Sequence, residues 1–319
     1  MYLIGTDEAG YGPNLGPLVI SATVWQISGE SMMVDLYERL SEVVAARSGE
    51  RSPTKMAIAD SKVLYKPGGG LRQIERGVLA ALSLLGHQAR STSELWKQLA
   101  PDAVAQRLAL PWHASHDQPL PRDVAEDDLR ALIPALRTGL EEAGVRLVTM
   151  RSTTLFPPRF NQQVERHGNK ASALSMASLE LVRDMLSPLD DAPIHVICDK
   201  HGGRNRYGPI LQTIFPDNLV EVLCEGRSRS AYRWGPPERR IEIQFQAGGE
   251  QFLPAALASM ASKYLREIAM EALNDYWTDK VDGLRPTAGY PVDAKRFKAD
   301  IAPAQKDLAI DDHDIWRCR

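Results

Sequence analysis

Hydrophobic and polar positions follow two different periods along this chain. Apolar runs rich in β-branched residues predict strands at residues 2–4, 17–25, 145–150, 194–198, 219–224 and 239–245. Apolar residues at helical spacing predict helices at 33–46, about 71–85, 169–186 and about 254–277, with a glycine-rich turn at 68–70. We expect the first two strands to pair antiparallel, because only a loop joins them. Strands followed by alternating helices and strands indicate an α/β fold with a mixed sheet.

One segment departs from this alternation. Residues 91–142 contain five prolines and short amphipathic pieces around Trp96, Leu99, Leu110 and Trp112. This pattern predicts an inserted, mainly helical subdomain. The rest of 1–319 is expected to be a single domain with a helical C-terminal part at 254–319.

Composition narrows the class of protein. The chain has 38 Lys and Arg against 41 Asp and Glu, with 44% hydrophobic residues, which is ordinary for a globular protein and excludes wholesale disorder. No apolar run is long enough to span a membrane, and the first residues lack the basic region of a signal peptide. Three cysteines are too few for a disulfide framework or a zinc site. We therefore expect a cytoplasmic protein without membrane contact.

Four acidic residues stand where sites are commonly built. Asp7 and Glu8 end the first predicted strand, Asp199 ends another, and Glu267 lies on the long helix in one polar stripe with Ser259 and Lys263. Carboxylates that converge from several elements repel one another, and Mg²⁺ or Mn²⁺ relieves that repulsion with oxygen ligands. Two such ions can activate water for phosphodiester hydrolysis.

Each of these features also has an ordinary structural interpretation. Asp7 alone is typical of a turn or a helix cap, and Glu267 alone is typical of an i,i+4 salt bridge on a solvated helix. The loop at 10–16 could be any tight turn, and Asp60-Ser61-Lys62 could be a cap followed by a surface lysine. Only their occurrence together, in this order, points to an active site.

Basic residues interleaved with aromatic residues form three clusters, at 200–207, 227–234 and 295–298. Such clusters suit a phosphate backbone with stacked bases or sugars. A solvated basic face is the alternative for each of them.

Six segments resemble, in order, the motifs of ribonuclease HII, the type 2 ribonuclease H. They are LIGTDEAGYGPNLGPLVISATV at 3–24, IADSKVL at 58–64, 160–174 with NKASAL, HVICD at 195–199, ASMASKYLRE at 258–267 and AGY at 288–290. The resemblance covers roughly two thirds of the chain.

This resemblance implies a ribonuclease H-like fold with a five-stranded mixed sheet, completed at its site by the helical part 254–319. It implies a two-metal site for Mg²⁺ or Mn²⁺ whose catalytic ligands are Asp7, Glu8, Asp199 and Glu267. It also implies substrate contacts from Gly10, Tyr11, Gly12, Lys62, Lys263 and Tyr290.

The chain departs from the family's pattern in three places. Tyr11 stands where the family has arginine between two glycines, Pro291–Lys295 replaces the usual threonine and histidine, and extra residues occur at 91–142 and around 225–240. The expected function is a metal-dependent endonuclease that hydrolyses the RNA strand of RNA–DNA hybrids or cuts at ribonucleotides in duplex DNA. The alternatives are a divergent nuclease of the same fold acting on another nucleic-acid structure, and a non-catalytic hybrid-binding protein. Tyr11 leaves open the choice between a single ribonucleotide and a long hybrid.

Overall fold

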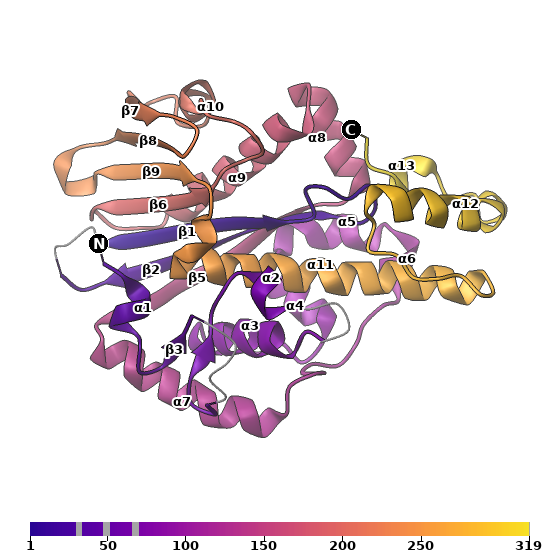
Figure 1. Cartoon of the computed structure of the whole chain (residues 1–319), viewed down its shortest axis with the longest axis horizontal. Helices are drawn as coiled ribbons and strands as arrows, with labels where there is room; N and C mark the ends of the chain where they lie inside the picture. Colours follow the sequence, from indigo (N-terminus) through magenta and orange to yellow (C-terminus); the bar gives the residue numbers. More distant parts are fainter. Residues whose placement is uncertain (30–33, 47–51, 66–69, 319) are drawn as a thin grey trace.

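A seven-stranded mixed sheet forms the centre of the molecule (Figure 1). The computed structural model describes residues 1–29, 34–46, 52–65 and 70–318. The strand order is β5–β2–β1–β6–β9–β8–β7, with bounds β1 Tyr2–Ala9, β2 Leu18–Ile27, β5 Val145–Leu155, β6 Ile194–Asp199, β7 Glu221–Glu225, β8 Arg229–Trp234 and β9 Ile241–Gln246. A separate two-stranded sheet joins β3 Val44–Ala45 and β4 Met56–Ala57.

The predicted α/β fold with a mixed sheet is confirmed. β1 pairs antiparallel with β2, as expected, and parallel with β6, which in turn pairs parallel with β9. The expected count of five strands is wrong, because β7 and β8 extend the sheet beyond β9 as an antiparallel pair. The sequence indicated a basic and aromatic cluster over β8 and no strand, because Arg229 and Arg233 flank the buried residues Ala231 and Tyr232.

The helices surround this sheet. Their bounds are α1 Leu36–Arg39, α2 Ser61–Leu64, α3 Arg72–Leu84, α4 Thr92–Leu99, α5 Val104–Leu108, α6 Pro111–Ala114, α7 Glu126–Glu142, α8 Pro157–His167, α9 Lys170–Leu186, α10 Gly208–Ile214, α11 Leu253–Lys280, α12 Pro291–Asp307 and α13 Asp312–Ile315. The helices predicted at 71–85, 169–186 and 254–277 are confirmed as α3, α9 and α11. Most of the turn predicted at 68–70 lies outside the described residues.

The helix predicted at 33–46 is wrong over most of its length. Within the described part of that range only Leu36–Arg39 is helical, and Val44 already belongs to β3. Leu36, Leu40 and Val43 are buried all the same. A turn and a short strand therefore bury the apolar positions whose spacing had indicated a helix.

Two layers of helices cover the two faces of the sheet. Leu3 packs into a hydrophobic cluster with α3 and α11, while its neighbours Tyr2 and Ile4 pack into a second cluster with α9 and α10. The long helix α11 lies along β1 and β2 (Figure 1). A Cβ atom on Gly5 would lie 2.1 Å from the Ala255 nitrogen, so only glycine at this position lets α11 approach β1 so closely. This contact brings the polar positions of α11 to the end of β1.

Residues 91–142 are mainly helical and contribute to the α11 side of the core. Trp96, Leu110 and Trp112 are buried in the same hydrophobic cluster as α3 and α11. The Trp96 ring lies 5.7 Å from that of Phe156, and the Trp112 ring lies 6.2 Å from that of Tyr276. These residues therefore stabilise the main core, and the boundaries of an inserted subdomain stay a prediction.

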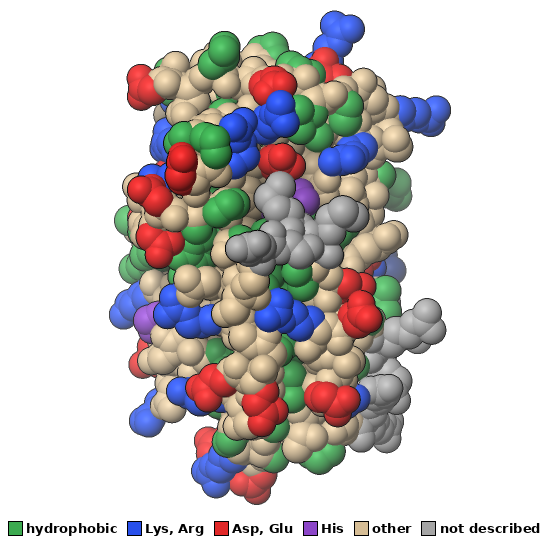
Figure 2. Space-filling model, turned by 90° about the vertical axis from the view of Figure 1, so that its left-hand side faces the viewer, with side chains coloured by type: hydrophobic (Ala, Val, Ile, Leu, Met, Phe, Trp, Pro, Cys, Tyr) green, Lys and Arg blue, Asp and Glu red, His purple; other side chains and the backbone are tan. Residues whose placement is uncertain are grey.

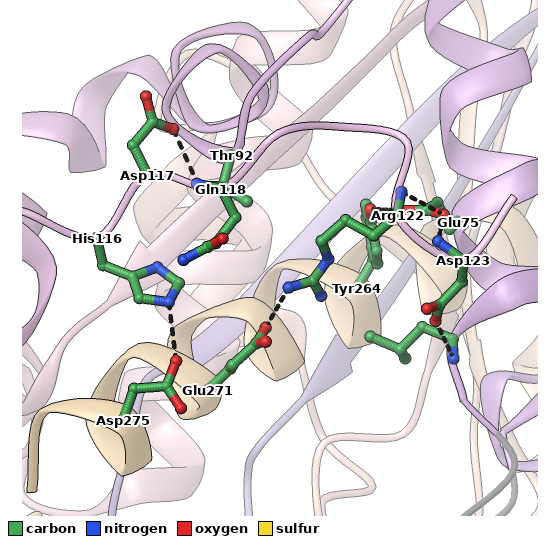
Figure 3. A network of polar contacts seen from close by, with 11 residues as sticks. Glu75, Thr92, His116, Asp117, Gln118, Arg122, Asp123, Tyr264, Glu271 and Asp275 are labelled. Carbon is green, nitrogen blue, oxygen red and sulfur yellow. Dashed lines mark hydrogen bonds and ion pairs between the residues drawn. The ribbon is translucent and has the colours of Figure 1, made fainter. Parts of the chain in front are cut away.

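The buried carboxylate of Glu75 connects residues 91–142 to α3 and α11 (Figure 3). Glu75 on α3 accepts hydrogen bonds from the backbone nitrogens of Arg122, Asp123 and Val124, at 2.7–3.1 Å, and from the Tyr264 hydroxyl at 2.6 Å. Arg122 also pairs with Glu271 on α11 at 2.6 Å. A carboxylate with this many donors can be buried at little cost.

Candidate active site

The sheet places two predicted acidic residues side by side. The last parallel pair between β1 and β6 is Thr6 with Cys198, so Asp7 and Asp199 follow on adjacent strands. Leu3 faces the α11 side and Cys198 faces the α9 side. Because strand side chains alternate, Asp7 and Asp199 both face α11.

Two serines on α11 form hydrogen bonds at the end of β1. The Ser262 hydroxyl donates to the Asp7 carbonyl at 3.0 Å and lies 2.8 Å from the Ser21 hydroxyl. The Asp7 carboxylate has a hydrogen bond with Ser259, whose hydroxyl oxygen lies 3.0 Å from that of Ser61. Hydrogen bonds of Ser61, Ser259 and Ser262 therefore connect α2, α11 and the end of β1. Ser259 had been noted only as part of the polar stripe.

The acidic residues at the strand ends influence one another electrostatically. Burial raises the pKa of Asp7 to about 7, helped by the charge of Asp199 and opposed by the Ser259 hydrogen bond and by Lys62. Burial raises the pKa of Glu8 to about 8, and the charges of Asp7 and Asp199 add to the effect. Asp7, Glu8 and Asp199 therefore form one electrostatic group, which we call the acidic centre. A cation would favour its ionised form.

Lys62 is the cation that lies close enough to lower the pKa of both Asp7 and Glu8. It follows Asp60, whose carboxylate caps α2 by accepting from the Lys62 backbone nitrogen at 3.0 Å. The cap interpretation of Asp60-Ser61-Lys62 is thus correct, and the same cap holds Lys62 near the acidic centre.

Glu267 contacts two cationic side chains of its own helix, α11. Its carboxylate accepts from Lys263 at 2.6 Å and lies 3.5 Å from Arg266. The Lys263 ammonium also lies 4.1 Å from the ring centre of Tyr65. This is the i,i+4 salt bridge that the sequence left as the alternative. Over residues 1–29, 34–46, 52–65 and 70–318, no three His, Cys, Asp or Glu side chains are grouped so that they could hold a metal ion.

The loop that follows β1, residues 10–16 and hereafter the glycine loop, has a constrained backbone. Gly10 has a φ of +93°, and a Cβ atom there would lie 2.5 Å from the Pro17 carbonyl oxygen. Both facts require glycine. A Cβ atom on Gly12 would lie 3.9 Å from the ring of Tyr290, which is 58% exposed. The structure therefore brings Tyr290 beside the glycine loop.

Tyr11 lies between the acidic centre and a basic side chain. Burial raises the pKa of the Tyr11 hydroxyl, and the charge of Glu8 adds to the effect. The Lys170 ammonium lies 4.8 Å from the Tyr11 ring centre. A cavity of about 180 Å³ is lined by Tyr11, Asn14, Lys170 and Arg317, among others. Arg317 was not predicted as a site residue, because a single arginine near the end of the chain belongs to no pattern.

The three basic clusters are largely committed to internal contacts. Lys200 donates to the Gly226 carbonyl at 2.6 Å, Arg233 pairs with Glu221 at 2.7 Å, and Arg296 pairs with Asp293 at 2.6 Å. Figure 2 shows the face seen from the left of Figure 1, where Lys and Arg are interspersed with Asp and Glu. These contacts favour the structural interpretation for the residues named. No helix in the part of the chain described here is long and apolar enough to cross a membrane.

Comparison with solved structures returns ribonucleases of type H. The chain is similar to ribonuclease HII from Archaeoglobus fulgidus, solved in complex with PCNA, at 14% identity and a TM-score of 0.46, over 100% of this chain and 95% of that one. It is similar to ribonuclease H2 from Pyrococcus horikoshii OT3 at 16% identity and a TM-score of 0.44, over 99% and 92%. For Bst-RNase HIII in complex with Mn²⁺ the values are 14% and 0.38, over 99% and 66%.

Sequence comparison finds no matching family model and no matching curated protein. At TM-scores of 0.46 and below, the structural likeness carries no conclusion about the activity of this chain. The function must therefore be inferred from its own residues.

Proposed function

We propose that this protein is a metal-dependent endonuclease of the ribonuclease H type, which hydrolyses the RNA strand of an RNA–DNA hybrid or cuts beside ribonucleotides in duplex DNA. The observation that carries the proposal is the acidic centre, in which burial and mutual repulsion raise the pKa of Asp7 and Glu8 toward neutrality. Such groups concentrate at functional sites.

The donor set of the acidic centre suits a hard divalent cation, because it consists of carboxylates. To hold Mg²⁺ or Mn²⁺, the side chains of Asp7, Glu8 and Asp199 would have to move closer together, and Glu267 would join them after leaving Lys263. The cation supplies a water of lowered pKa and charge stabilisation for a phosphodiester.

The surrounding side chains have separate tasks in this proposal. Lys62 balances the charge of Asp7 and Glu8 and meets a phosphate of the substrate. The glycine loop approaches the sugar, and the exposed ring of Tyr290 packs beside it. Lys263, released from Glu267, is a second phosphate contact. Hydroxyl recognition at the sugar distinguishes RNA from DNA.

Cleavage of three end-labelled duplexes tests the proposal. One carries an all-RNA strand, one a single ribonucleotide and one only DNA, each with Mg²⁺ and with Mn²⁺. Cleavage of an RNA-containing duplex but not of the DNA duplex supports the proposal. Absence of cleavage in all three with either metal contradicts it.

A second candidate is a non-catalytic protein that binds RNA–DNA hybrids. The Lys263–Glu267 ion pair favours it, because the carboxylate of the fourth acidic residue is already paired with a cation. Tight hybrid binding by fluorescence anisotropy, without cleavage in the same metal buffers, would select this candidate.

A further inference from the structure

The last described residues of the chain are held between the glycine loop and α8. Trp316 forms an antiparallel bridge with Leu15, and the Arg317 nitrogen donates to the Asn14 carbonyl at 2.9 Å. On the other side, the Asn161 side chain donates to the Trp316 carbonyl at 2.9 Å and accepts from the Cys318 nitrogen at 2.7 Å. Trp316 and Arg317, about three hundred positions further along the chain, thus pack against the glycine loop.

The Arg317 side chain inserts behind this loop. It is 1% exposed, and its Nη1 donates to the Gly10 carbonyl at 2.5 Å while Nη2 lies 3.4 Å from the Tyr11 carbonyl oxygen. Its guanidinium carbon lies 3.8 Å from the ring centre of Phe160. Among the described residues no carboxylate pairs with Arg317. Burial, together with the charge of Arg266, lowers the pKa of Arg317 to about 9.

Burying a cation without a carboxylate partner costs folding free energy. The contacts of Arg317 with the loop carbonyls therefore indicate a role beyond filling space. In a trans peptide the C=O and the N–H point in opposite directions. The carbonyls of Gly10 and Tyr11 point toward Arg317, so the N–H groups of Tyr11 and Gly12 point away from it. No group within the described residues accepts a hydrogen bond from either N–H.

We propose that Arg317 is a positioning residue for the glycine loop. By holding two carbonyls it aims the N–H groups of Tyr11 and Gly12 outward, where they can donate to an oxygen of the substrate, such as a sugar hydroxyl. The nature of this ligand rests on the proposed function; the role of Arg317 in fixing the loop does not.

Three variants test the role of Arg317. Arg317→Met removes the guanidinium and keeps the length of the side chain. Arg317→Lys keeps the charge but presents a single ammonium, which we expect to satisfy one carbonyl. Lys298→Met is the matched control, because Lys298 lies 4.9 Å from the Trp316 ring and pairs with Asp312 without touching the glycine loop.

Hydrogen exchange by mass spectrometry reports on the loop without reference to function. In Arg317→Met we expect exchange of the peptide covering 10–17 to be accelerated about tenfold or more, because the Asn14 and Leu15 nitrogens lose their fixed bonds to the Gly289 carbonyl. We expect Arg317→Lys to give an intermediate change and Lys298→Met to match the wild type. Unchanged exchange at 10–17 in both Arg317 variants would overturn the proposal. If the Met variant does not fold, the Lys variant decides.

Binding in metal-free buffer then tests the ligand. We expect Arg317→Met to reduce the ratio of affinities for an RNA–DNA hybrid over the matching DNA duplex about tenfold, while its affinity for the DNA duplex stays within about twofold. An unchanged ratio would overturn the recognition step. Equal affinity of the wild type for both duplexes would instead contradict the proposed function, and the exchange result would still decide the role of Arg317.

Discussion

Replacing Asp7 by asparagine should stabilise the metal-free protein more at pH 8 than at pH 5. The pKa of Asp7 is raised from 3.8 to about 7 in the folded protein. Between these two values the folded state binds more protons than the unfolded state, so stability falls as pH rises through this window and is constant above it. Asparagine at position 7 cannot ionise, so the variant does not lose stability in this way as the pH rises.

The size of the effect follows from the shift. Each pKa unit corresponds to about 1.4 kcal/mol, so a shift of about three units sets an upper limit of about 4 kcal/mol. The altered hydrogen bond with Ser259 offsets about 1 kcal/mol of this. We therefore expect Asp7→Asn to gain up to about 3 kcal/mol in the free energy of unfolding at pH 8, or about 4 °C in Tm.

Urea denaturation at pH 5, 6, 7 and 8 in EDTA measures this gain. The exposed Asp217→Asn serves as a control and should follow the wild type at every pH. Parallel stability curves for Asp7→Asn and the wild type, or a loss of stability in Asp7→Asn at pH 8, would refute the electrostatic account of the acidic centre.

Three further substitutions have defined outcomes. Glu75→Gln should cost about 2 kcal/mol in urea denaturation, because one carboxylate oxygen that accepts from backbone nitrogens becomes an amide donor; exposed Glu126→Gln is the control, and equal stabilities would dismiss the role of Glu75. Trp112→Ala should cost about 3 kcal/mol or more if residues 91–142 support the main core; a loss below about 1 kcal/mol would show that they do not. Tyr11→Arg should increase cleavage at a single ribonucleotide more than cleavage of a long hybrid, because a cation adds a charge-assisted phosphate contact. Equal changes in kcat/KM on both substrates would mean that Tyr11 belongs to another recognition scheme.

Long elements with a clear period were predictable from the sequence. The helix α11 was visible because it is long and rich in apolar residues, most of which are buried, and β1, β2 and β6 were visible as apolar runs. The helix expected at 33–46 failed because a turn at Leu40 and the short strand at Val44 bury the same apolar residues. Tertiary packing overrides local spacing in such short segments.

The candidate site was predictable only in part, for a similar reason. Strand ends identify Asp7 and Asp199 as neighbours once their strands pair in parallel. The sequence allowed Glu267 either to pair with Lys263 or to join the other acidic residues at a metal site. The structure has the pair with Lys263. Arg317 reaches the glycine loop from the far end of the chain, and no local pattern encodes a contact over that separation.

The most direct test of the central claim compares the wild type with Asp199→Asn in single-turnover cleavage of an RNA–DNA hybrid with Mg²⁺ or Mn²⁺. Asp199→Asn changes the charge of the acidic centre while nearly preserving the shape of the side chain. We expect the wild type to cleave the RNA strand and Asp199→Asn to lose at least about a thousandfold in rate, since a metal-binding charge is lost. A near-normal rate in Asp199→Asn, in a protein of unchanged fold by circular dichroism, would contradict the account.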